Sequence, residues 1–376
     1  LISDKSLKLP TDASVSNPRN VFLESPMNRG LTWRAPATFV TRRDRSRTRS
    51  LDLLTLASQY AIAFLYYQKK DALIYYSNID RSSLRHALKV NPSGKYLGRR
   101  FLAEKLLPIV SVETTERNIG TFNSFFVYSK YAFVGQFYDS SRWQALEARW
   151  TYLRRIDISN CFKSIYTHSI SWSTGTDTMS KLHLSKPRDK NGYIDLGRAF
   201  DKIMQSSNWG ETHGIAVGPE ASRVFAEIIF QSIDQEIKTR LDGCRIRRGS
   251  YEFLRYVDDY FVFSNENHVR DEVSKVISGV LNEHKFAINE SKPRDFDTPF
   301  TSEISTRRAA LRTFLVSALP FDGSPPHYEA RDIGVQLKLL LIGGENDAAT
   351  IGSALSHIER RLKKFIVRQC SMAQTP

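Results

Sequence analysis

The stretch Phe253–Phe263, FLRYVDDYFVF, places two adjacent carboxylates between two apolar runs. The runs Phe253–Val257 and Tyr260–Ser264 are rich in aromatic and β-branched residues, which predicts two strands joined at hairpin spacing. Adjacent acids in a turn are common and usually reflect only solvated turn chemistry. Here apolar strands enclose charges that a purely structural turn does not require, so we interpret Asp258 and Asp259 as candidate catalytic carboxylates.

A third carboxylate, Asp157, lies near the end of another predicted strand, Tyr152–Ile158. Phosphodiester synthesis needs a nucleophilic 3′-hydroxyl and a triphosphate whose developing charge is neutralised, a task suited to two metal ions held by carboxylates. Mg²⁺ prefers oxygen ligands and keeps several waters, so few protein ligands are enough. We therefore predict two Mg²⁺ ions, with Mn²⁺ as an alternative, held by Asp157, Asp258 and Asp259.

The elements around these residues follow the order strand, helix, strand, strand, helix, strand. A strongly amphipathic helix opens at Gly218, and a second apolar helical face runs from Val269 to Leu281. The segment Phe286–Asn289 has the pattern of a short final strand. This series is the split-βαβ arrangement of ferredoxin-like folds, and the predicted class is α+β.

The chain divides by composition into four predicted parts. These are a basic N-terminal arm (1–50), a partly helical segment (51–150) with helical periodicity from about Leu51 to Tyr76, the ferredoxin-like part (151–295), and a helical subdomain (296–376). In the last part helices are predicted over residues 308–319, 330–341 and 351–368. The arm carries five arginines between Arg42 and Arg49. It is either a solvated leader or a phosphate-binding strap, and the pattern favours neither.

The overall balance of charge favours a polyanionic partner. Lysine and arginine outnumber the acids 54 to 40, which gives a net charge of +14. Three cysteines with no CxxC pair support neither a disulfide framework nor a structural zinc site, so we expect a reducing cytoplasm. The longest apolar stretch, Leu53–Tyr67, is shorter than the ~20 residues of a membrane-spanning helix, and we expect no membrane partner.

Two segments resemble motifs of reverse transcriptases. Tyr256–Asp259, YVDD, is similar to their YxDD motif, and Asp157–Phe162, DISNCF, is similar to the metal-binding motif that precedes it. The resemblance implies a right-hand polymerase, with fingers in residues 51–150, the palm in 151–295 and a thumb-like part in 296–376. It implies that the carbonyl of Ile158 contacts a metal. It also implies that Phe162 is the aromatic gate that excludes a ribose 2′-hydroxyl, so deoxynucleotides are the expected substrate. An ordinary core aromatic is the alternative for Phe162.

Further roles follow from the same resemblance and from position. The amides of Ser159, Asn160 and Cys161 are expected to face the incoming triphosphate. Other predicted residues are Arg117, Gly218, Ser222 and Arg223 for substrate, Lys292 as a catalytic proton donor, and Tyr256, Arg255, Arg99 and Arg100 for nucleic acid. Arg99 and Arg100 compete with Arg117 for the triphosphate. Arg255 is equally well explained by an ion pair with a nearby acid, and His168 by a structural role.

Two longer segments narrow the resemblance. Ser164–Trp172, SIYTHSISW, and Gly214–Arg223, GIAVGPEASR, resemble the abortive-infection and defence-associated reverse transcriptases of bacteria. This implies anti-phage DNA synthesis, which in that group includes untemplated and protein-primed synthesis. Retroviral and retron enzymes have LPQG where this chain has Ile215–Gly218, IAVG, so the Gln near the template base pair is missing.

The expected partners are dNTPs and a DNA product, with a non-coding RNA, a partner reverse transcriptase and a homo- or hetero-oligomer as further expectations. Two other functions stay open: an RNA-synthesising palm polymerase, and a nucleic-acid-binding scaffold whose palm has lost catalysis. A diguanylate-cyclase-like palm is disfavoured because the GG[DE]EF signature is absent.

Overall fold

The computed structural model describes residues 35–42, 48–91, 114–115, 124–129, 131, 133–175, 195–244, 246–247, 249–289, 294–300, 303–318, 330–341 and 358. The chain divides into two compact units, residues 1–39 with 51–298, and residues 40–50 with 299–376. Each unit is described by itself.

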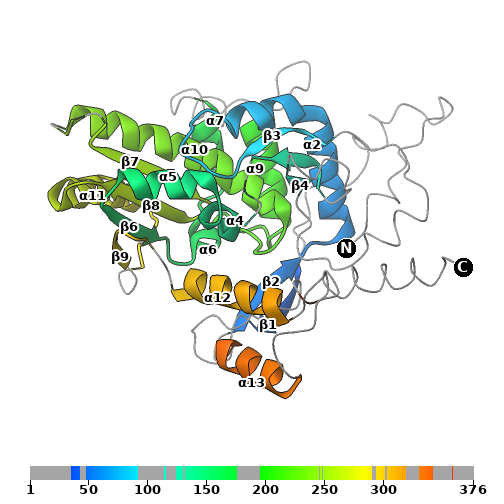
Figure 1. Ribbon diagram of the computed structural model, residues 1–376. Helices are drawn as coiled ribbons and strands as arrows, with labels where there is room; N and C mark the ends of the chain where they lie inside the picture. Colours follow the sequence, from blue (N-terminus) through cyan, green and yellow to red (C-terminus); the bar gives the residue numbers. More distant parts are fainter. Residues whose placement is uncertain are drawn as a thin grey trace, which may run out of the picture. The chain divides into compact units, whose positions relative to one another are not determined.

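The first unit is built on a four-stranded antiparallel sheet in the order β7-β8-β6-β9 (Figure 1). Its strands are β6 (Tyr152–Asp157), β7 (Tyr251–Tyr256), β8 (Asp259–Ser264) and β9 (Arg294–Asp297). The split-βαβ order predicted for this region is confirmed. The predicted last strand, Phe286–Asn289, is wrong: it forms only an isolated bridge between Ile288 and Ile158, and the sheet edge is completed by β9.

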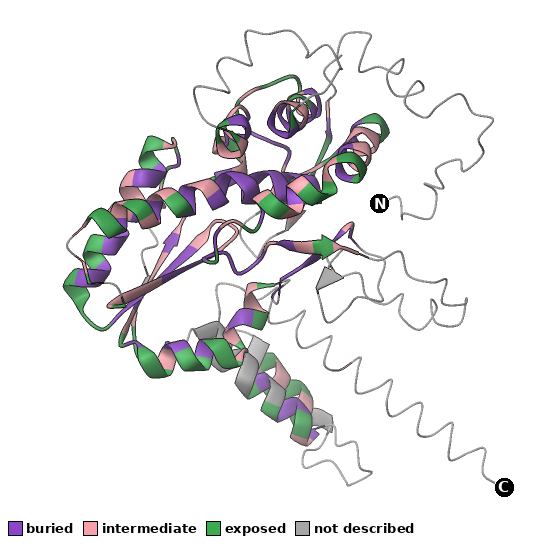
Figure 2. Cartoon of the chain, turned by 90° about the horizontal axis from the view of Figure 1, so that it is seen from above, coloured by how far each residue is buried: buried purple, intermediate pink, exposed green. Residues whose placement is uncertain are grey.

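One face of this sheet is covered by two long helices, α10 (Glu220–Gly243) and α11 (Asn267–Glu283). Both were predicted from apolar periodicity, and the apolar residues of the two predicted faces are buried except Val276, which is half-buried. Buried and half-buried residues run along the strands, while exposed residues lie on the outward sides of the helices (Figure 2). The apolar residues buried along α10 are Val224, Phe225, Ile228, Ile229, Phe230, Ile233, Ile237 and Leu241.

The opposite face of the sheet is covered at one end by two short helices, α4 (Val134–Tyr138) and α5 (Ser141–Arg149). Trp143 of α5 packs with its ring centroid 6.3 Å from that of Phe261 and 6.0 Å from that of Phe263. Phe137 of α4 lies 5.6 Å from Phe261. Because these rings cover the middle and far end of β8, the end that begins with Asp259 is left to the polar residues of the site.

Further helices and strands complete the first unit, and two of these helices, α2 (Leu56–Tyr76) and α7 (Ser169–Thr174), contact α10. Residues Leu51–Tyr76 were predicted as one helix, but Leu51–Leu53 belong to a strand, and the helix begins only after the Thr55 cap, whose hydroxyl accepts from the Ser58 amide. The other elements are β3 (Ala87–Val90), β4 (Thr114–Thr115), β5 (Phe126–Tyr128), α6 (Cys161–Ser164) and α9 (Leu196–Ser206). The division between the two units falls within β1 (Ala37–Arg42) and β2 (Thr48–Leu53). Strands β3, β5 and β4 form a small separate sheet.

The second unit contains α12 (Glu303–Ala318) and α13 (Ala330–Leu341). Its core includes Leu311, Phe314 and Leu315, with Ile333 and Leu337 packed against them. Helices were predicted over residues 308–319 and 330–341, and both are confirmed. The helix predicted over residues 351–368 lies outside the described residues. Among the described helices of both units, none combines the length and apolar character needed to span a bilayer.

Candidate active site

Adjacent strands carry the predicted carboxylates to one end of the sheet. On the face that α4 and α5 partly cover, three successive cross-strand pairs of β6 and β8 change from apolar to charged. They are Leu153 with Phe263, Arg155 with Phe261, and Asp157 with Asp259. Directly opposed residues have Cβ atoms about 4.5–5.5 Å apart, so the Asp157 and Asp259 carboxylates share one face and one end of the sheet. Both residues are half-buried.

The third carboxylate, Asp258, lies in the tip of the β7–β8 hairpin. Tyr256 pairs with Asp259, which leaves Val257 and Asp258 as a two-residue turn. Val257 has φ = 58°, and the turn has a positive φ only at this first position, the pattern of a type II′ turn. The amide of Ile158 donates to the Asp258 carbonyl over 3.4 Å, so the tip lies beside the end of β6.

Each carboxylate of the facing pair has a polar neighbour. The Asn289 side-chain amide donates to Asp157 Oδ2 over 3.1 Å, and the Asn289 backbone amide donates to the Asp157 carbonyl over 2.9 Å. Arg155 Nη2 lies 3.4 Å from Asp259 Oδ1, with its guanidinium 5.5 Å from the centroid of Phe261. Burial lowers the pKa of Arg155, but the fields of Tyr138 and Asp259 outweigh this and raise it, so Arg155 remains a cation.

The donor chemistry of this sheet end suits a hard divalent cation. Carboxylate oxygens are the ligands that Mg²⁺ prefers, and it needs few of them because it keeps waters. Within the described residues, however, no three or more His, Cys, Asp or Glu side chains are gathered closely enough to hold a metal ion. The backbone therefore brings the aspartates to one place, and the donor set fits Mg²⁺ without already enclosing a three-ligand site.

The segment after β6 is fixed by the chain around it. Asn160 adopts a left-handed conformation (φ 49°, ψ 35°) and begins α6. The Ser159 amide donates to the Ala287 carbonyl over 2.8 Å, so the prediction that this amide faces a triphosphate is wrong. Cys161 is buried, and burial together with the charge of Asp258 raises the pKa of its thiol. Phe162 is half-buried against the core, so a packing role and a gating role are both compatible with its position.

The segment Gly214–Gly218 runs beside α6. The Gly214 amide donates to the Ile165 carbonyl over 2.8 Å, and the Ile215 amide to the Phe162 carbonyl over 2.9 Å. Gly214 has φ = +84°, and a Cβ there would lie 3.0 Å from the Lys163 carbonyl oxygen, so this position requires glycine.

Two predicted substrate contacts at the start of α10 have different outcomes. Ser222 is fully buried, and its hydroxyl donates to the Ala216 carbonyl over 2.6 Å, so its assignment to substrate is wrong. This hydrogen bond links the first turn of the helix to the segment that precedes it. Arg223 is half-buried and close enough to Tyr256 to influence the pKa of that tyrosine. Its assignment stays a prediction.

Asp52 of β2 is a polar residue of this region that sequence reasoning missed. Its amide donates to the Val217 carbonyl over 2.7 Å, and its Oδ2 accepts from the Val217 amide over 2.8 Å. Thr38 donates to the other carboxylate oxygen over 2.8 Å. The strand thus binds the segment that replaces LPQG, and a Cβ on Gly218 (φ +120°) would lie 3.4 Å from the Leu51 side chain. The only sequence signal was an acid set within an otherwise apolar start, Leu51–Leu54.

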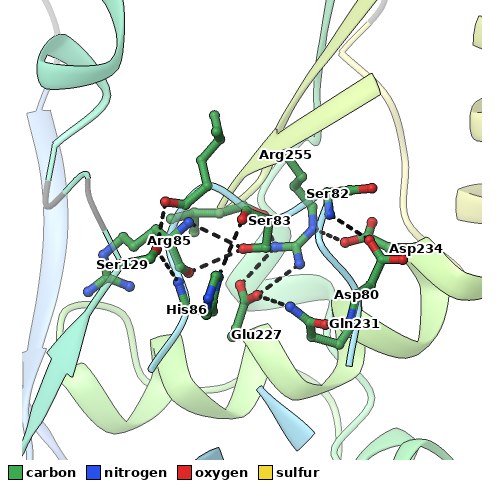
Figure 3. Close-up of polar contacts among 12 residues, drawn as sticks. Asp80, Ser82, Ser83, Arg85, His86, Ser129, Glu227, Gln231, Asp234 and Arg255 are labelled. Carbon is green, nitrogen blue, oxygen red and sulfur yellow. Dashed lines mark hydrogen bonds and ion pairs between the residues drawn. The ribbon is translucent and has the colours of Figure 1, made fainter. Parts of the chain in front are cut away.

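Arg255 is not available to a nucleic acid, and that prediction is wrong. Its side chain is fully buried on the α10 face of the sheet, where its guanidinium binds Glu227 and Asp234 of α10 (Figure 3). The alternative of an ion pair with nearby acids is therefore the correct one. Glu227 and Asp234 lie seven residues apart on α10, a spacing that places both on one side of the helix and was a signal that could have been used.

Tyr256, on the other face of β7, is half-buried. Burial raises the pKa of its hydroxyl to about 12, although the nearby cations Arg85 and Arg223 act in the opposite direction, so the hydroxyl stays protonated at neutral pH. Its nucleic-acid role stays a prediction. His168 hydrogen-bonds through Nδ1 to the buried Asp201 over 2.6 Å, which fits its structural interpretation. The predicted roles of Arg99, Arg100, Arg117 and Lys292 lie outside the described residues.

Comparison with solved structures finds polymerases of low similarity. Apo telomerase from Candida tropicalis, truncated from its C-terminal domain, is 14% identical with a TM-score of 0.37, over 72% of this chain and 51% of that chain. Telomerase from Candida albicans in complex with the TWJ fragment of telomeric RNA is 13% identical with a TM-score of 0.37, over 89% and 55%. The BmCPV RNA-dependent RNA polymerase at quiescent state is 11% identical with a TM-score of 0.40, over 89% and 28%.

This chain therefore spans about half the length of those telomerase chains. No curated protein matches it in sequence. Residues 116–302, which include the whole four-stranded sheet and its three aspartates, match the family described as reverse transcriptase (RNA-dependent DNA polymerase). With this match the predicted α+β right-hand polymerase fold is confirmed. The chain contains a reverse transcriptase domain, the domain of the RNA-dependent DNA polymerases, which are nucleotidyltransferases.

Proposed function

We propose that this protein adds deoxynucleotides to a 3′-hydroxyl, or to a protein hydroxyl, with Asp157, Asp258 and Asp259 as the acidic centre. The observation that carries the proposal is the register of β6 and β8, which sets Asp157 opposite Asp259 and brings Asp258 to the same end of the sheet. The net charge of +14 supports a nucleic-acid partner. Residues 51–150 as fingers and 296–376 as a thumb-like part belong to the same proposal.

The carboxylates of this chain and their polar neighbours form a centre that suits a bound cation. Asp157 and Asp258 would hold Mg²⁺, which when bound supplies charge neutralisation for the triphosphate and lowers the pKa of the attacking hydroxyl. Asn289 fixes one oxygen of Asp157 and leaves the other free of that contact. Arg155 lies against Asp259 and reduces the mutual repulsion of the carboxylates. Asp259 therefore contributes charge and shape more than direct coordination.

A defence role against phage is part of the proposal and rests on the resemblance of Ser164–Trp172 and Gly214–Arg223 to bacterial abortive-infection enzymes. The same resemblance supports synthesis without a conventional template. Support from the fold is that Val217, which replaces the Gln of LPQG, is engaged through its backbone by Asp52.

The test is incubation of the purified protein with Mg²⁺ and each dNTP, singly and in pairs, with and without added RNA, followed by sequencing of the product. Asp258→Asn keeps the size of the side chain and removes its charge, and we expect at least a loss of about a hundredfold in incorporation. Glu272→Gln, an exposed acid of α11, is the matched control. No incorporation by the unaltered protein, or full incorporation by Asp258→Asn, would overturn the proposal.

The choice of sugar is tested in the same assay. If Phe162 is the gate, Phe162→Ala should admit ribonucleotides, whereas a purely packing role predicts reduced stability and an unchanged preference for deoxynucleotides. An RNA-synthesising enzyme would instead prefer ribonucleotides before any substitution. For a non-catalytic scaffold, Asp258→Asn would leave biological activity intact.

A further inference from the structure

The hairpin tip that carries Asp258 is held in a conformation that its sequence does not favour. Val257 has φ = 58°. A positive φ at the first turn position is normally taken by glycine, and for a β-branched residue it is an outlier that strains the backbone. A neighbouring contact must therefore stabilise this turn against rearrangement.

Arg255 provides a contact of this kind. Its Nη1 donates to the Val257 carbonyl over 3.1 Å. The two ends of a trans peptide point in opposite directions, so fixing this carbonyl toward α10 directs the Asp258 amide away from α10. A relaxed turn would rotate the peptide and break this charged hydrogen bond. Because Arg255 pairs with Tyr260 in the β7–β8 register, its side chain lies on the opposite face from Asp259 and acts through the backbone.

The guanidinium is itself fixed from several directions (Figure 3). Nη1 and Nη2 donate to the two oxygens of Glu227 over 2.9 and 3.0 Å, and Nε donates to Asp234 over 2.8 Å. The acids are held in turn, since Gln231 donates to Glu227 and Tyr260 donates to Asp234, each over 2.8 Å. A fork of donors in this arrangement cannot be reproduced by the single ammonium of a lysine.

The backbone of Arg255 is fixed as well. Its amide donates to the Ser82 carbonyl over 2.8 Å, and its carbonyl accepts from the Leu84 amide over 2.7 Å. Asp80 anchors this incoming segment by accepting from Lys238 of α10 and from the Ser82 amide, each over 2.6 Å. Arg255, two residues before the hairpin tip, is therefore held by a second chain segment through its backbone and by α10 through its side chain.

We propose that Arg255 is a positioning residue that holds the Val257–Asp258 peptide, and through it the Asp258 carboxylate, in the geometry used for nucleotide addition. The effect on turnover rests on the proposed function, whereas the effect on the turn does not. A residue needed only for core stability would lower the stability of the whole palm, while a positioning residue changes the tip selectively.

The test compares the full-length protein with Arg255→Lys, Val257→Gly and the double variant. Hydrogen–deuterium exchange should rise in Arg255→Lys at residues 257–259 and stay unchanged in α10 and in residues 261–264. In the nucleotide-addition assay, Arg255→Lys should lower kcat by about tenfold or more and leave KM for dNTP within about twofold. Glycine adopts the left-handed conformation without strain, so in the Val257→Gly background the same substitution should cost less than about threefold in kcat.

Several outcomes would overturn the proposal. These are an equal loss of kcat in both backgrounds, exchange that rises as much in α10 as at the tip, or no change in exchange. If Arg255→Lys does not fold, Glu227→Gln loosens the same clamp with little change of shape and is taken through the same comparison. If the unaltered protein adds no nucleotide, the proposed function fails, and the exchange measurement still decides whether Arg255 holds the tip.

Discussion

Replacing Asp234 by Asn should change how the stability of the protein depends on pH. Asp234 is fully buried, accepting from Arg255 Nε and from the Tyr260 hydroxyl, each over 2.8 Å. Burial raises the pKa of this carboxyl to about 6, against the lowering effect of Arg255 and Tyr260, and the negative charge of Glu227 adds to the rise. The ordinary value for an aspartate is 3.8.

The direction in which stability changes with pH follows from how many protons the folded and unfolded states bind at Asp234. Between pH 3.8 and about 6 the folded protein holds a proton on Asp234 that the unfolded chain has released. The contribution of Asp234 to the free energy of unfolding is therefore largest in acid and is lost as the pH rises through about 6. The total loss over the whole pH range is about 3 kcal/mol. Between about pH 4.5 and about pH 7.5 the expected loss is about 2 kcal/mol.

Urea unfolding of the unaltered protein and of Asp234→Asn at these two pH values measures the effect. Titrating groups distant from Asp234 are common to both proteins and cancel in the difference between their free energies of unfolding. The substitution also changes the hydrogen bonding of the site, but that contribution is the same at both pH values. The unaltered protein should lose about 2 kcal/mol relative to the variant on going from the lower to the higher pH. A constant difference, or one that changes in the other direction, would refute the reasoning.

Two further substitutions test the segment beside α6. Gly214→Ala should lower the free energy of unfolding by about 1–3 kcal/mol, because the new Cβ meets the Lys163 carbonyl oxygen at 3.0 Å and the residue must keep φ = +84°. Urea unfolding checks this, and an unchanged midpoint would contradict it. Asp52→Ala should cost about 1–3 kcal/mol because it leaves the Val217 amide without its carboxylate partner, with the exposed Asp71→Ala of α2 as the control. Equal stability of the two alanine variants would contradict the second expectation.

The central sheet was predictable because the spacing of apolar residues predicts each helix and strand, and the order of these elements along the chain predicts how they pair. Apolar residues four apart on α10 and the apolar runs on both sides of Asp258 and Asp259 predicted the elements, and the tip of a hairpin brings two strand ends together whatever the loops do. The edge strand was not predictable in the same way. Phe286–Asn289 has strand-like composition, but only Ile288 makes a bridge, and Arg294–Asp297 takes the edge through its register with β6.

Individual side chains were harder to assign because a sequence does not say which face of an element is covered. Arg255 precedes a motif for nucleotide chemistry, yet its register with Tyr260 places it under the sheet, where only ion pairing is compatible with full burial. Ser222 begins a helix where a phosphate contact is reasonable, yet its hydroxyl is already bound by the Ala216 carbonyl. Arg255 and Ser222 are therefore both buried, bind backbone carbonyls and do not line the site.

The replacement of LPQG by IAVG has a structural counterpart that follows from the same residues. A valine at position 217 has no side-chain amide, so its only polar groups are those of its backbone, and both are paired with Asp52 of β2. The Cα of Gly218 is approached by Leu51 of the same strand. The two residues of β2 that make these contacts, Leu51 and Asp52, belong to the first unit and follow the predicted arm in sequence. At residue 217 Asp52 binds backbone groups alone, so this pairing does not depend on the side chain there, and a glutamine at position 217 would leave both hydrogen bonds in place.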